Sequence, residues 1–401
     1  MTQVRPNMPM DEARAASQHP TVEELLVRLA PILPAIKERI AAADLARDTP
    51  AETVRELAAA DLFRLFQPQQ WGGFESDPRI FFALQNAIAQ VCPSTAWVYG
   101  VLCVQSFLVS LFDEQAQADV WERDGRALIG SAGTPAGTAT PVEGGFRVTG
   151  RWTFSSGSSH AKWALLGARL PDAPVAGPPL LNVFLVPRED FELVDVWHSF
   201  GLRATGSNDI IANDIFVPKH RTITLDPGIQ NIRREMRAGP ALYRLPWLYL
   251  FSSSISNLAI GTARAALDGF LSITRSRVSV LTGKIAREDP AVQQAAGRLA
   301  SEIEAAPAMY DRHVERLLHY EMIDTPIPMQ EAVLIRTQLT AGLRKFASLV
   351  DDLMMLQGAR ATDLNSPVTR AWLDLNAARA HLGNDPTMAT TMLGAMLIGQ
   401  G

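Results

Sequence analysis

The chain has 401 residues, of which 47% are hydrophobic and 20% charged, and its formal net charge is −5. This composition is typical of a globular protein that is long enough for one large core or for several smaller ones. The acidic balance and the lack of a basic cluster argue against nucleic acid and anionic membranes as partners, and the two cysteines, Cys92 and Cys103, fit a reducing cytoplasm.

The first part of the chain is predicted to be helical. Residues 1–20 lack the apolar stretch of a signal peptide and are expected to form a flexible tail. Residues 21–126 carry apolar side chains at helical spacing, first from Val22 and again from Ile32. They are therefore expected to form an N-terminal helical domain.

Two helix-start signals and one apolar stretch lie within this domain. The order Thr49-Pro-Ala-Glu52 predicts a capping box, and Asp77-Pro78 predicts the start of a further helix. Residues 91–112 carry no charge and are long enough to span a bilayer, but serine, threonine and glutamine are spread through them. We therefore predict a buried helix and no membrane span.

Residues 127–222 consist of short β-branched and aromatic runs separated by glycine, proline and serine. They predict a small β barrel or sandwich, with a hairpin turn at Val142-Glu-Gly-Gly-Phe146. Residues 223–401 return to helical periodicity and predict an antiparallel four-helix bundle that also mediates oligomerisation. The candidate helices are 248–277, 290–320, 328–356 and 367–382. The predicted fold class is therefore α+β, in the order helical, β, helical.

Two polar loops lie in the β region. In Gly150–Trp163, a strand-like run opens into a stretch rich in serine and glycine. In His198–Asp209, glycines, hydroxyls and one arginine precede another strand-like run. Such loops offer backbone N–H groups, hydroxyls and a guanidinium to an anionic or heteroaromatic ligand, although ordinary surface turns have the same composition.

The two loops together resemble the flavin-contacting loops of the acyl-CoA dehydrogenase superfamily, and within it the flavin-dependent monooxygenase branch. The residues that carry the resemblance are Phe154-Ser-Ser-Gly157 with His160-Ala161, and Gly201-Leu-Arg-Ala-Thr-Gly-Ser207. The resemblance implies helical, β and four-helix-bundle domains and a homotetramer whose flavin sites are built across subunits.

The resemblance also assigns roles to residues of both loops. Phe154 takes the aromatic position of the family's flavin motif, and Ser156 takes the hydroxyl position near N5 of the isoalloxazine ring. A register shift of one residue would put Ser155 there instead. In the second loop, contact with the flavin or the substrate channel is implied for Arg203, Thr205 and Ser207.

Further site residues are implied outside these loops. Arg277 falls where the family places an arginine from a neighbouring subunit on the cofactor's phosphate, and Arg275 is the rival candidate. The segment from Asn365 to His381 resembles a family segment that puts a histidine beside the substrate. The expected catalytic residues are thus His381 and Ser156, and the substrate-side candidates are Ser131, His160 and His381.

Several other catalytic signatures are missing. The chain has no GxGxxG, GxxxxGK[ST], HExxH or GxSxG motif, so a Rossmann-type nicotinamide enzyme is disfavoured. No metal site is expected, because His313 and His319 are spaced to point apart on a helix. An acyl-CoA dehydrogenase also needs a carboxylate base, and its two usual places here hold His381-Leu-Gly-Asn-Asp385 and a stretch without glutamate between Pro240 and Glu288.

The expected function is that of the oxygenase component of a two-component flavin-dependent monooxygenase. Reduced flavin, as FMNH2 or FADH2, would come from a separate NAD(P)H-dependent flavin reductase. With O2 it would form a C4a-hydroperoxide that transfers one oxygen atom to an aromatic, phenolic substrate, which His381 would orient or deprotonate. The alternatives are an acyl-CoA dehydrogenase, an N- or S-oxygenase acting on an amino sugar or thiophene, and a non-catalytic scaffold.

Overall fold

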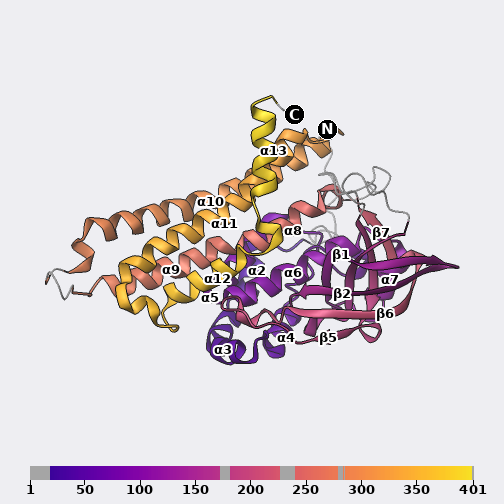
Figure 1. The fold of residues 1–401 in the computed structure, drawn as a ribbon, viewed down its shortest axis with the longest axis horizontal. Helices are drawn as coiled ribbons and strands as arrows, with labels where there is room; N and C mark the ends of the chain where they lie inside the picture. The colour runs from indigo at the N-terminus through magenta and orange to yellow at the C-terminus, as the bar shows by residue number, and fades with distance from the viewer. Residues whose placement is uncertain (1–18, 172–180, 226–239, 279–282, 284, 400–401) are drawn as a thin grey trace, which may run out of the picture.

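The computed structural model of the protein describes residues 19–171, 181–225, 240–278, 283 and 285–399. Helices come first, a sheet follows and helices return at the end, as the sequence predicts (Figure 1). The sheet lies at one end of the molecule and the long C-terminal helices extend toward the other (Figure 1). Residues 1–18 of the expected flexible tail lie outside the described residues.

The N-terminal helices begin at recognisable caps. At the start of α2, the Thr21 hydroxyl accepts from the Glu24 amide, while the Glu24 carboxylate accepts from the Thr21 amide. α5 starts after Asp77, as predicted, and the Asp77 carboxylate accepts from the Arg79 amide. The helices are α2 (Val22–Leu29), α3 (Ile32–Ala46), α4 (Ala51–Ala59), α5 (Pro78–Val91), α6 (Pro93–Val109) and α7 (Glu114–Trp121).

The capping box predicted at Thr49 is wrong. α4 starts one residue later than this motif requires, with Pro50 at its N-cap, so Thr49 lies outside the helix. The buried Thr49 hydroxyl instead donates to the carbonyl of Ala204 over 2.7 Å. A long-range partner has replaced the local one, and the bond joins the N-terminal helices to the second polar loop.

α6 is the buried helix that the sequence predicts. All of its residues from Ser94 to Val109 are buried, and it contacts both the sheet and α8 (Trp247–Ser256). Within the described ranges, no helix is both long and apolar enough to cross a membrane. α6 thus forms the centre of the molecule, where the three parts of the chain meet.

The strands form one sheet in the order β5-β6-β2-β1-β3-β4-β7. β1 pairs in parallel with β3, and the other neighbouring pairs are antiparallel. The predicted hairpin is confirmed, because Val142 pairs with Gly145 across a two-residue turn. The strands are β1 (Ile129–Val142), β2 (Gly145–Ser155), β3 (Trp163–Arg169), β4 (Leu181–Pro187), β5 (Glu192–Val194), β6 (Asn208–Pro218) and β7 (Thr222–Leu225).

The sheet curls around a core of its own. Phe146 of β2 and Phe184 of β4 meet at 5.3 Å between ring centroids, although β1 and β3 separate their strands. The fully buried Trp152 lies in the same core and donates to the Gly167 carbonyl over 2.6 Å. The β region is therefore a single curled, barrel-like sheet and not a sandwich of two sheets.

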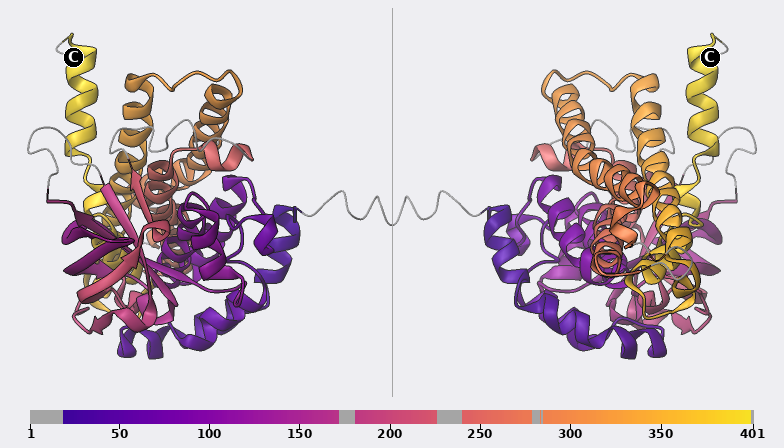
Figure 2. Two further views of the ribbon diagram at one scale, coloured as in Figure 1. Left: turned by 90° about the vertical axis from the view of Figure 1, so that its right-hand side faces the viewer. Right: turned by 90° about the vertical axis from the view of Figure 1, so that its left-hand side faces the viewer.

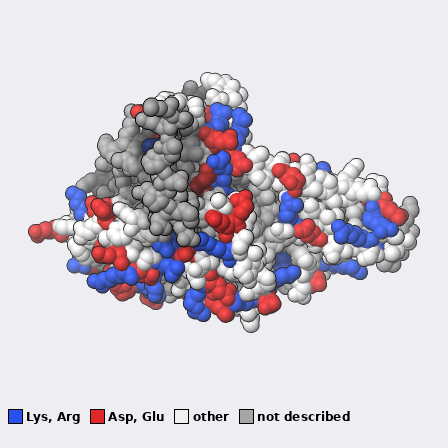
Figure 3. All heavy atoms as spheres, turned by 180° about the vertical axis from the view of Figure 1, so that it is seen from behind, with Lys and Arg blue, Asp and Glu red and all other residues white. Residues whose placement is uncertain are grey.

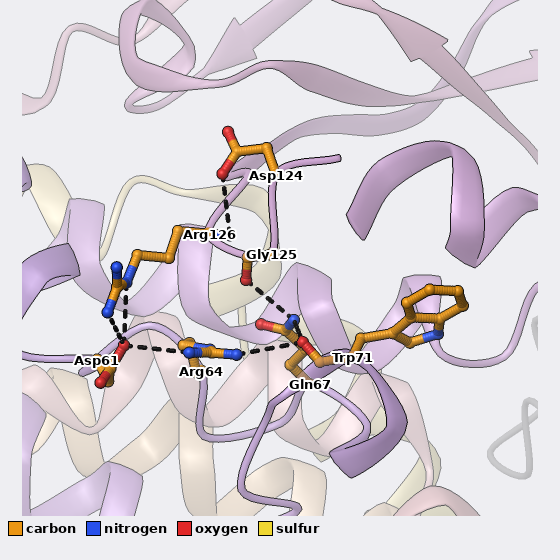
Figure 4. A network of polar contacts seen from close by, with 7 residues as sticks. All are labelled: Asp61, Arg64, Gln67, Trp71, Asp124, Gly125 and Arg126. Atoms are coloured by element: carbon orange, nitrogen blue, oxygen red, sulfur yellow. Dashed lines mark hydrogen bonds and ion pairs between the residues drawn. The ribbon is translucent and has the colours of Figure 1, made fainter. Parts of the chain in front are cut away.

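A polar network fastens the end of α4 to the chain just before β1 (Figure 4). The Asp61 carboxylate accepts from Arg126 over 2.9 Å and from Arg64 over 3.3 Å. The carbonyl of Trp71 accepts from Arg64 and from Gln67. The members of the network are Asp61, Arg64, Gln67, Trp71, Asp124, Gly125 and Arg126. It joins the segment that follows α4 to the segment that leads into β1.

The C-terminal helices include the predicted bundle. Its helices are α9 (Leu258–Thr274), α10 (Pro290–Met322), α11 (Met329–Gln357) and α12 (Pro367–Ala378). The first candidate, 248–277, is in fact two helices, α8 and α9, that join at Asn257. The buried Asn257 amide donates to the Phe82 carbonyl and to Gln85 Oε1 of α5, which anchors the junction.

One further helix, α13 (Thr387–Leu397), was not predicted. It projects at the edge of the molecule (Figure 2) and contacts α11. Among its described residues only Ala389 is buried, whereas Met388 and Leu397 are 76% and 66% exposed. Acidic and basic side chains are interspersed on the described surface seen in Figure 3, which shows no extended basic area. α13 itself carries no charged residue, and its exposed side chains are those of threonines and of the apolar Met388, Met392 and Leu397.

Candidate active site

Three parts of the chain meet at the indole of Trp97, on α6. The ring is 4% exposed, and its Nε1–H donates to Ser156 Oγ over 3.0 Å. The ring also meets the imidazole of His381 edge-on, at 5.5 Å between centroids. Trp97 therefore links the two residues that the sequence predicts to be catalytic, one from the end of the β2 strand and one from beyond α12.

Three hydroxyl groups form a line that starts at Ser156. Ser156 Oγ lies 2.7 Å from Ser207 Oγ, and Ser207 Oγ lies 2.7 Å from Thr205 Oγ1. The Thr205 hydroxyl in turn donates to the Leu202 carbonyl over 3.0 Å. Thr205 and Ser207 are buried, whereas Ser156 is half-buried. The structure thus brings together three of the residues that were expected to bind the cofactor.

Backbone contacts hold the two loops in this arrangement. The amide of Gly157 donates to the Thr205 carbonyl over 2.8 Å, which joins the first loop directly to the second. The amide of Ala204 donates to the Ser94 hydroxyl at the start of α6, over 3.3 Å. Each loop is thereby fixed both to its neighbour and to the central helix, so the Ser156 hydroxyl is held on a rigid frame.

Gly157 is required by the shape of the first turn. Its φ is +68°, a value that residues with a side chain rarely adopt. A Cβ atom at this position would lie 2.9 Å from Val98 Cγ1 and 3.2 Å from Leu102 Cδ1. The absence of a side chain allows the turn to rest directly on α6, and Ser156 thereby comes within reach of Trp97.

A buried carboxylate supports the second loop. Asp374 of α12 accepts the Leu202 amide on Oδ1 over 2.6 Å. Burial raises the pKa of Asp374 to about 7, against the opposing effects of the Leu202 amide and of Arg370. The helical spacing predicts an ion pair between Asp374 and Arg370, but Arg370 instead donates to Asp44 over 2.6 Å. Asp374 is therefore a support of the loop and not the partner of its helical neighbour.

The two candidate serines of the first loop occupy different environments. Ser155 is fully buried, and its hydroxyl has no hydrogen-bond partner among the described residues. A Cβ atom on Gly130 of β1 would lie 3.5 Å from Ser155 Oγ, so this hydroxyl faces the sheet. Ser156 faces Trp97 and the hydroxyl line instead. The geometry therefore favours the Ser156 register.

Phe154 and Arg203 are exposed beside the hydroxyl line. The Phe154 ring is 51% exposed and meets Trp197 edge-on at 5.3 Å. Arg203 is also exposed, and among the described residues its guanidinium donates only to the Asp44 carbonyl, at 3.5 Å. An aromatic face and a cation with spare N–H groups are thus available near Ser156.

His381 is held in a defined orientation. Its Nδ1 accepts the Gly383 amide over 2.9 Å, so Nδ1 carries no proton and the neutral ring carries its proton on Nε2. Burial and, to a smaller extent, the charge of Arg336 lower the pKa of His381 to about 4. The Phe251 ring lies 6.2 Å from the imidazole. At neutral pH the ring is uncharged and offers a donor.

The turn that carries His381 is fastened on two sides. Arg336 of α11 donates to the Gly383 carbonyl and to the Ser252 hydroxyl of α8. Asn384, which is buried, donates to the carbonyls of Ile255 and Ala378. These bonds tie the turn to three different helices, which accounts for the fixed ring orientation of a histidine that lies beyond a helix end.

The remaining predicted site residues lie apart from His381. Ser131 is half-buried in β1, opposite Leu165 of β3. His160 Nε2 lies 3.5 Å from Asp48 Oδ1, without hydrogen-bond geometry. No contact joins Ser131 or His160 to His381 within the described ranges. Their proposed role toward the substrate stays a prediction.

Arg277 lies at a separate place in the chain. Its guanidinium donates to the Leu356 carbonyl at the end of α11 over 2.8 Å, whereas Arg275 is exposed. Beside Leu356 there is a cavity of about 440 Å³, in which Gln357 Nε2 is buried and without a partner in the described structure. The cavity is lined by Ile273, Gln357, Arg360, Asp363, Asn365, Ser366 and Pro367. No described contact connects it with Ser156 of the same chain.

Sequence reasoning missed three residues of the site. Trp97 lies in an apolar stretch in which nothing local distinguishes it from a core residue. Asp374 has the helical spacing of an ion pair with Arg370, which gives no hint of its contact with the loop, and Arg336 carries no motif. The resemblance pointed to the segment around Asp374 but not to its contact with Leu202. Only the fold brings these side chains to the site.

Comparisons with known proteins give the following similarities. The family model described as acyl-CoA dehydrogenase, C-terminal domain, matches residues 253–386. The chain is 34% identical over 375 residues to the oxygenase subunit HsaA of a flavin-dependent monooxygenase from Rhodococcus jostii, covering 92% of this chain and 96% of that relative. It is 29% identical over 365 residues to the oxygenase component of an FADH2-dependent resorcinol hydroxylase from Rhizobium, covering 88% and 89% of the two chains.

The similarity extends to solved structures. A 3-HSA hydroxylase from Rhodococcus superposes on the chain with a TM-score of 0.85 and 32% sequence identity, covering 94% of this chain and 97% of the other. The likeness seen in two loops therefore extends along nearly the whole chain.

Proposed function

Because this chain belongs to the flavin-dependent monooxygenase branch of the acyl-CoA dehydrogenase superfamily, we propose that it hydroxylates a phenolic ring as the oxygenase component of a two-component system. The observation that carries the proposal is that Trp97 contacts both a hydroxyl line, through its indole N–H, and a neutral imidazole, through its ring. The hydroxyl line suits a flavin edge, and the imidazole suits a phenolic oxygen. The relatives named as oxygenase subunit or component imply a separate flavin reductase as partner.

The residues around Ser156 fit a flavin. An isoalloxazine ring needs hydrogen bonds along its edge, a flat apolar contact and a cation for the phosphate. Ser156 provides a half-buried hydroxyl, Phe154 an exposed ring and Arg203 an exposed guanidinium. When bound, reduced flavin reacts with O2 and supplies one oxygen atom to the substrate.

The chain's own residues then have distinct tasks. Ser156 holds the N5 edge of the ring, with its oxygen fixed by the Trp97 N–H and by Ser207. The buried neighbours Trp97 and Leu202 keep water from this edge. Exclusion of water matters because it limits the loss of oxygen equivalents as H2O2.

His381 orients the phenol in this proposal. Its Nδ1 lone pair is occupied by the Gly383 amide, so Nε2–H is the group left for the substrate oxygen. A donor stabilises and orients a substrate that binds as a phenolate after losing its proton to solvent, but it does not itself take up that proton. Of the two roles expected from the sequence, orientation therefore has more support than deprotonation.

The dehydrogenase alternative has less support. An acyl-CoA dehydrogenase needs a carboxylate that faces the substrate. The carboxylate nearest in sequence to His381 is Asp385, whose Oδ1 accepts from the amide and the hydroxyl of Thr387. Asp374 is buried and bound to Leu202. Neither group is placed as a free base.

The proposal includes a homotetramer in which Arg277 serves a neighbouring subunit's cofactor. Arg277 lies beside a cavity with an unpartnered Gln357 amide, away from the hydroxyl line of its own chain. The exposed apolar residues Met388 and Leu397 of α13 supply surface for association. Arg203 or Arg277 would then bind the cofactor's phosphate.

An anaerobic titration with reduced FMN and reduced FAD tests the function. We expect one of them to bind and the complex, once mixed with O2 and a suitable phenol, to yield hydroxylated product. Product and H2O2 are quantified together. Tightly bound oxidised FAD that is reduced by acyl-CoA would identify a dehydrogenase, and a lack of binding by either reduced flavin would identify a scaffold.

A further inference from the structure

The hydroxyl line has two ends of opposite character. At one end the indole N–H of Trp97 can only donate, and at the other the carbonyl oxygen of Leu202 can only accept. Between them lie the hydroxyls of Ser156, Ser207 and Thr205, each with a single proton. The successive distances are 3.0, 2.7, 2.7 and 3.0 Å, so every link is a hydrogen bond.

Because each hydroxyl has one proton, the bond at the Leu202 end determines which hydroxyl donates and which accepts along the line. The Thr205 proton is used in the bond to the Leu202 carbonyl. The contact between Thr205 and Ser207 therefore uses the proton of Ser207, and the contact between Ser207 and Ser156 uses the proton of Ser156. All protons point away from Trp97. The half-buried Ser156 oxygen is then left with a lone pair, and not a proton, for a ligand.

We propose that this ordered line makes the site select reduced over oxidised flavin. N5 of reduced flavin carries a proton and donates, whereas N5 of oxidised flavin carries only a lone pair and accepts. Ser156 as an acceptor therefore matches the reduced ring. For Ser156 to donate to N5 of the oxidised ring, each hydroxyl of the line must donate in the opposite direction. Thr205 then donates to Ser207, and its hydrogen bond to the Leu202 carbonyl is lost. The inference rests on the proposed function and gives a physical origin for its redox selectivity.

Thr205 is the positioning residue in this arrangement. It is fully buried, and its hydroxyl is occupied by Ser207 and Leu202, so it acts on the cofactor only through Ser156. Reversal of the line costs one hydrogen bond between neutral groups. Such a bond corresponds to a factor of about five in relative affinity.

The test compares Thr205→Val, which keeps the shape but removes the hydroxyl, with Thr205→Ser, which keeps the hydroxyl. The flavin used is FMN or FAD, whichever the unaltered protein binds more tightly in its reduced form. Dissociation constants of its oxidised and reduced forms are measured anaerobically. In Thr205→Val we expect the ratio of oxidised to reduced constants to fall about five-fold, because Ser207 is free to donate to Ser156. This equals a shift of about 20 mV in the midpoint potential of the bound flavin. In Thr205→Ser the ratio should stay within about two-fold of the original.

Ser207→Ala interrupts the same line one link nearer to the ligand and should lower the ratio as well. An unchanged ratio in both hydroxyl-deleted variants overturns the inference, as does an equal weakening of both redox states, which is the result of a merely structural role. In either case the proposed function stands if the unaltered protein binds reduced flavin and hydroxylates a phenol. Failure of the unaltered protein to bind reduced flavin overturns both.

Discussion

At the cofactor side of the site, next to the indole N–H of Trp97, neutral hydroxyls bond to one another and to a backbone carbonyl, whereas at the substrate side an imidazole lies among aromatic rings and near a guanidinium. The first arrangement contains no group that titrates near neutral pH. The second depends on the proton state of His381 and on the charge of Arg336. Protonation of His381, near its pKa of about 4, should therefore change the substrate side, whereas the cofactor side should respond to pH only through Asp374, the carboxylate that supports its second loop.

Substitution of Asp374 tests the pH dependence of the cofactor side and has the largest expected effect. The folded-state pKa of about 7 exceeds the ordinary value of 3.8, so between these values the folded state holds more protons than the unfolded chain. The free energy of unfolding therefore falls as the pH rises through this window. Asp374→Asn keeps an acceptor for Leu202 without a charge, and should add up to about 4 kcal/mol at pH 8.

Urea unfolding at pH 5 and at pH 8 measures this effect. The gain from Asp374→Asn should be largest at pH 8 and smaller at pH 5, and it should vanish only well below pH 3.8, where the carboxyl is protonated in both states. Arg370→Gln serves as a control, because it removes the neighbouring cation but leaves the carboxylate. A variant whose stability is lower than that of the original protein at pH 8 would contradict the raised pKa.

Substitution of His381 tests the substrate side of this comparison. His381→Ala removes the Nε2–H donor, and the yield of product per reduced flavin should fall roughly 10- to 150-fold, as for a hydrogen bond of about 1.5–3 kcal/mol to a charged oxygen. H2O2 should take the place of product. Because the pKa of His381 is about 4, its contribution should be constant between pH 6 and 8.

The variant His381→Gln separates the two possible roles of the ring. A glutamine amide donates a hydrogen bond but does not accept a proton as a base. If His381 only orients the substrate, this variant should recover much of the coupling. A glutamine variant as poorly coupled as His381→Ala, together with a rate that follows a titration near neutral pH, would support deprotonation instead.

Ser156→Ala tests the cofactor side and has the smallest expected effect. Loss of the hydroxyl leaves the Trp97 N–H without its acceptor, and should weaken reduced-flavin binding by roughly 1–3 kcal/mol with little dependence on pH. Ser155→Ala is the matched control, since its hydroxyl has no partner in the described structure. Equal effects of both substitutions would contradict the assignment of Ser156 as the residue that binds the flavin.

The order of the elements was predictable because their signals are local. The hairpin at Val142 and the buried helix within residues 91–112 follow from turn residues and from the absence of charge. The two loops were found from their resemblance to flavin loops. The sequence did not decide between a barrel and a sandwich, because the order of the strands in a sheet cannot be read from any single strand.

The parts that were missed depend on long-range contacts. Thr49 has the sequence of a capping residue, yet its hydroxyl bonds to Ala204, far away in the chain. Asp374 and Arg370 have the spacing of an ion pair, yet each has another partner. The proton position on His381 follows from the Gly383 amide, which only the folded turn presents. Local rules apply where no tertiary partner competes with them.

Gly157 limits how the first turn can be altered by directed evolution. In a library that randomises residues 156–160, selection for a folded protein should return glycine at 157, because any other residue combines an unfavourable φ with a clash against α6. Ser159, which is exposed, should accept most residues. Changes of substrate range are therefore better sought at Phe251 and Leu382, whose half-buried and exposed side chains border His381, while Gly383 is kept because a Cβ there would meet Ile255 and His381.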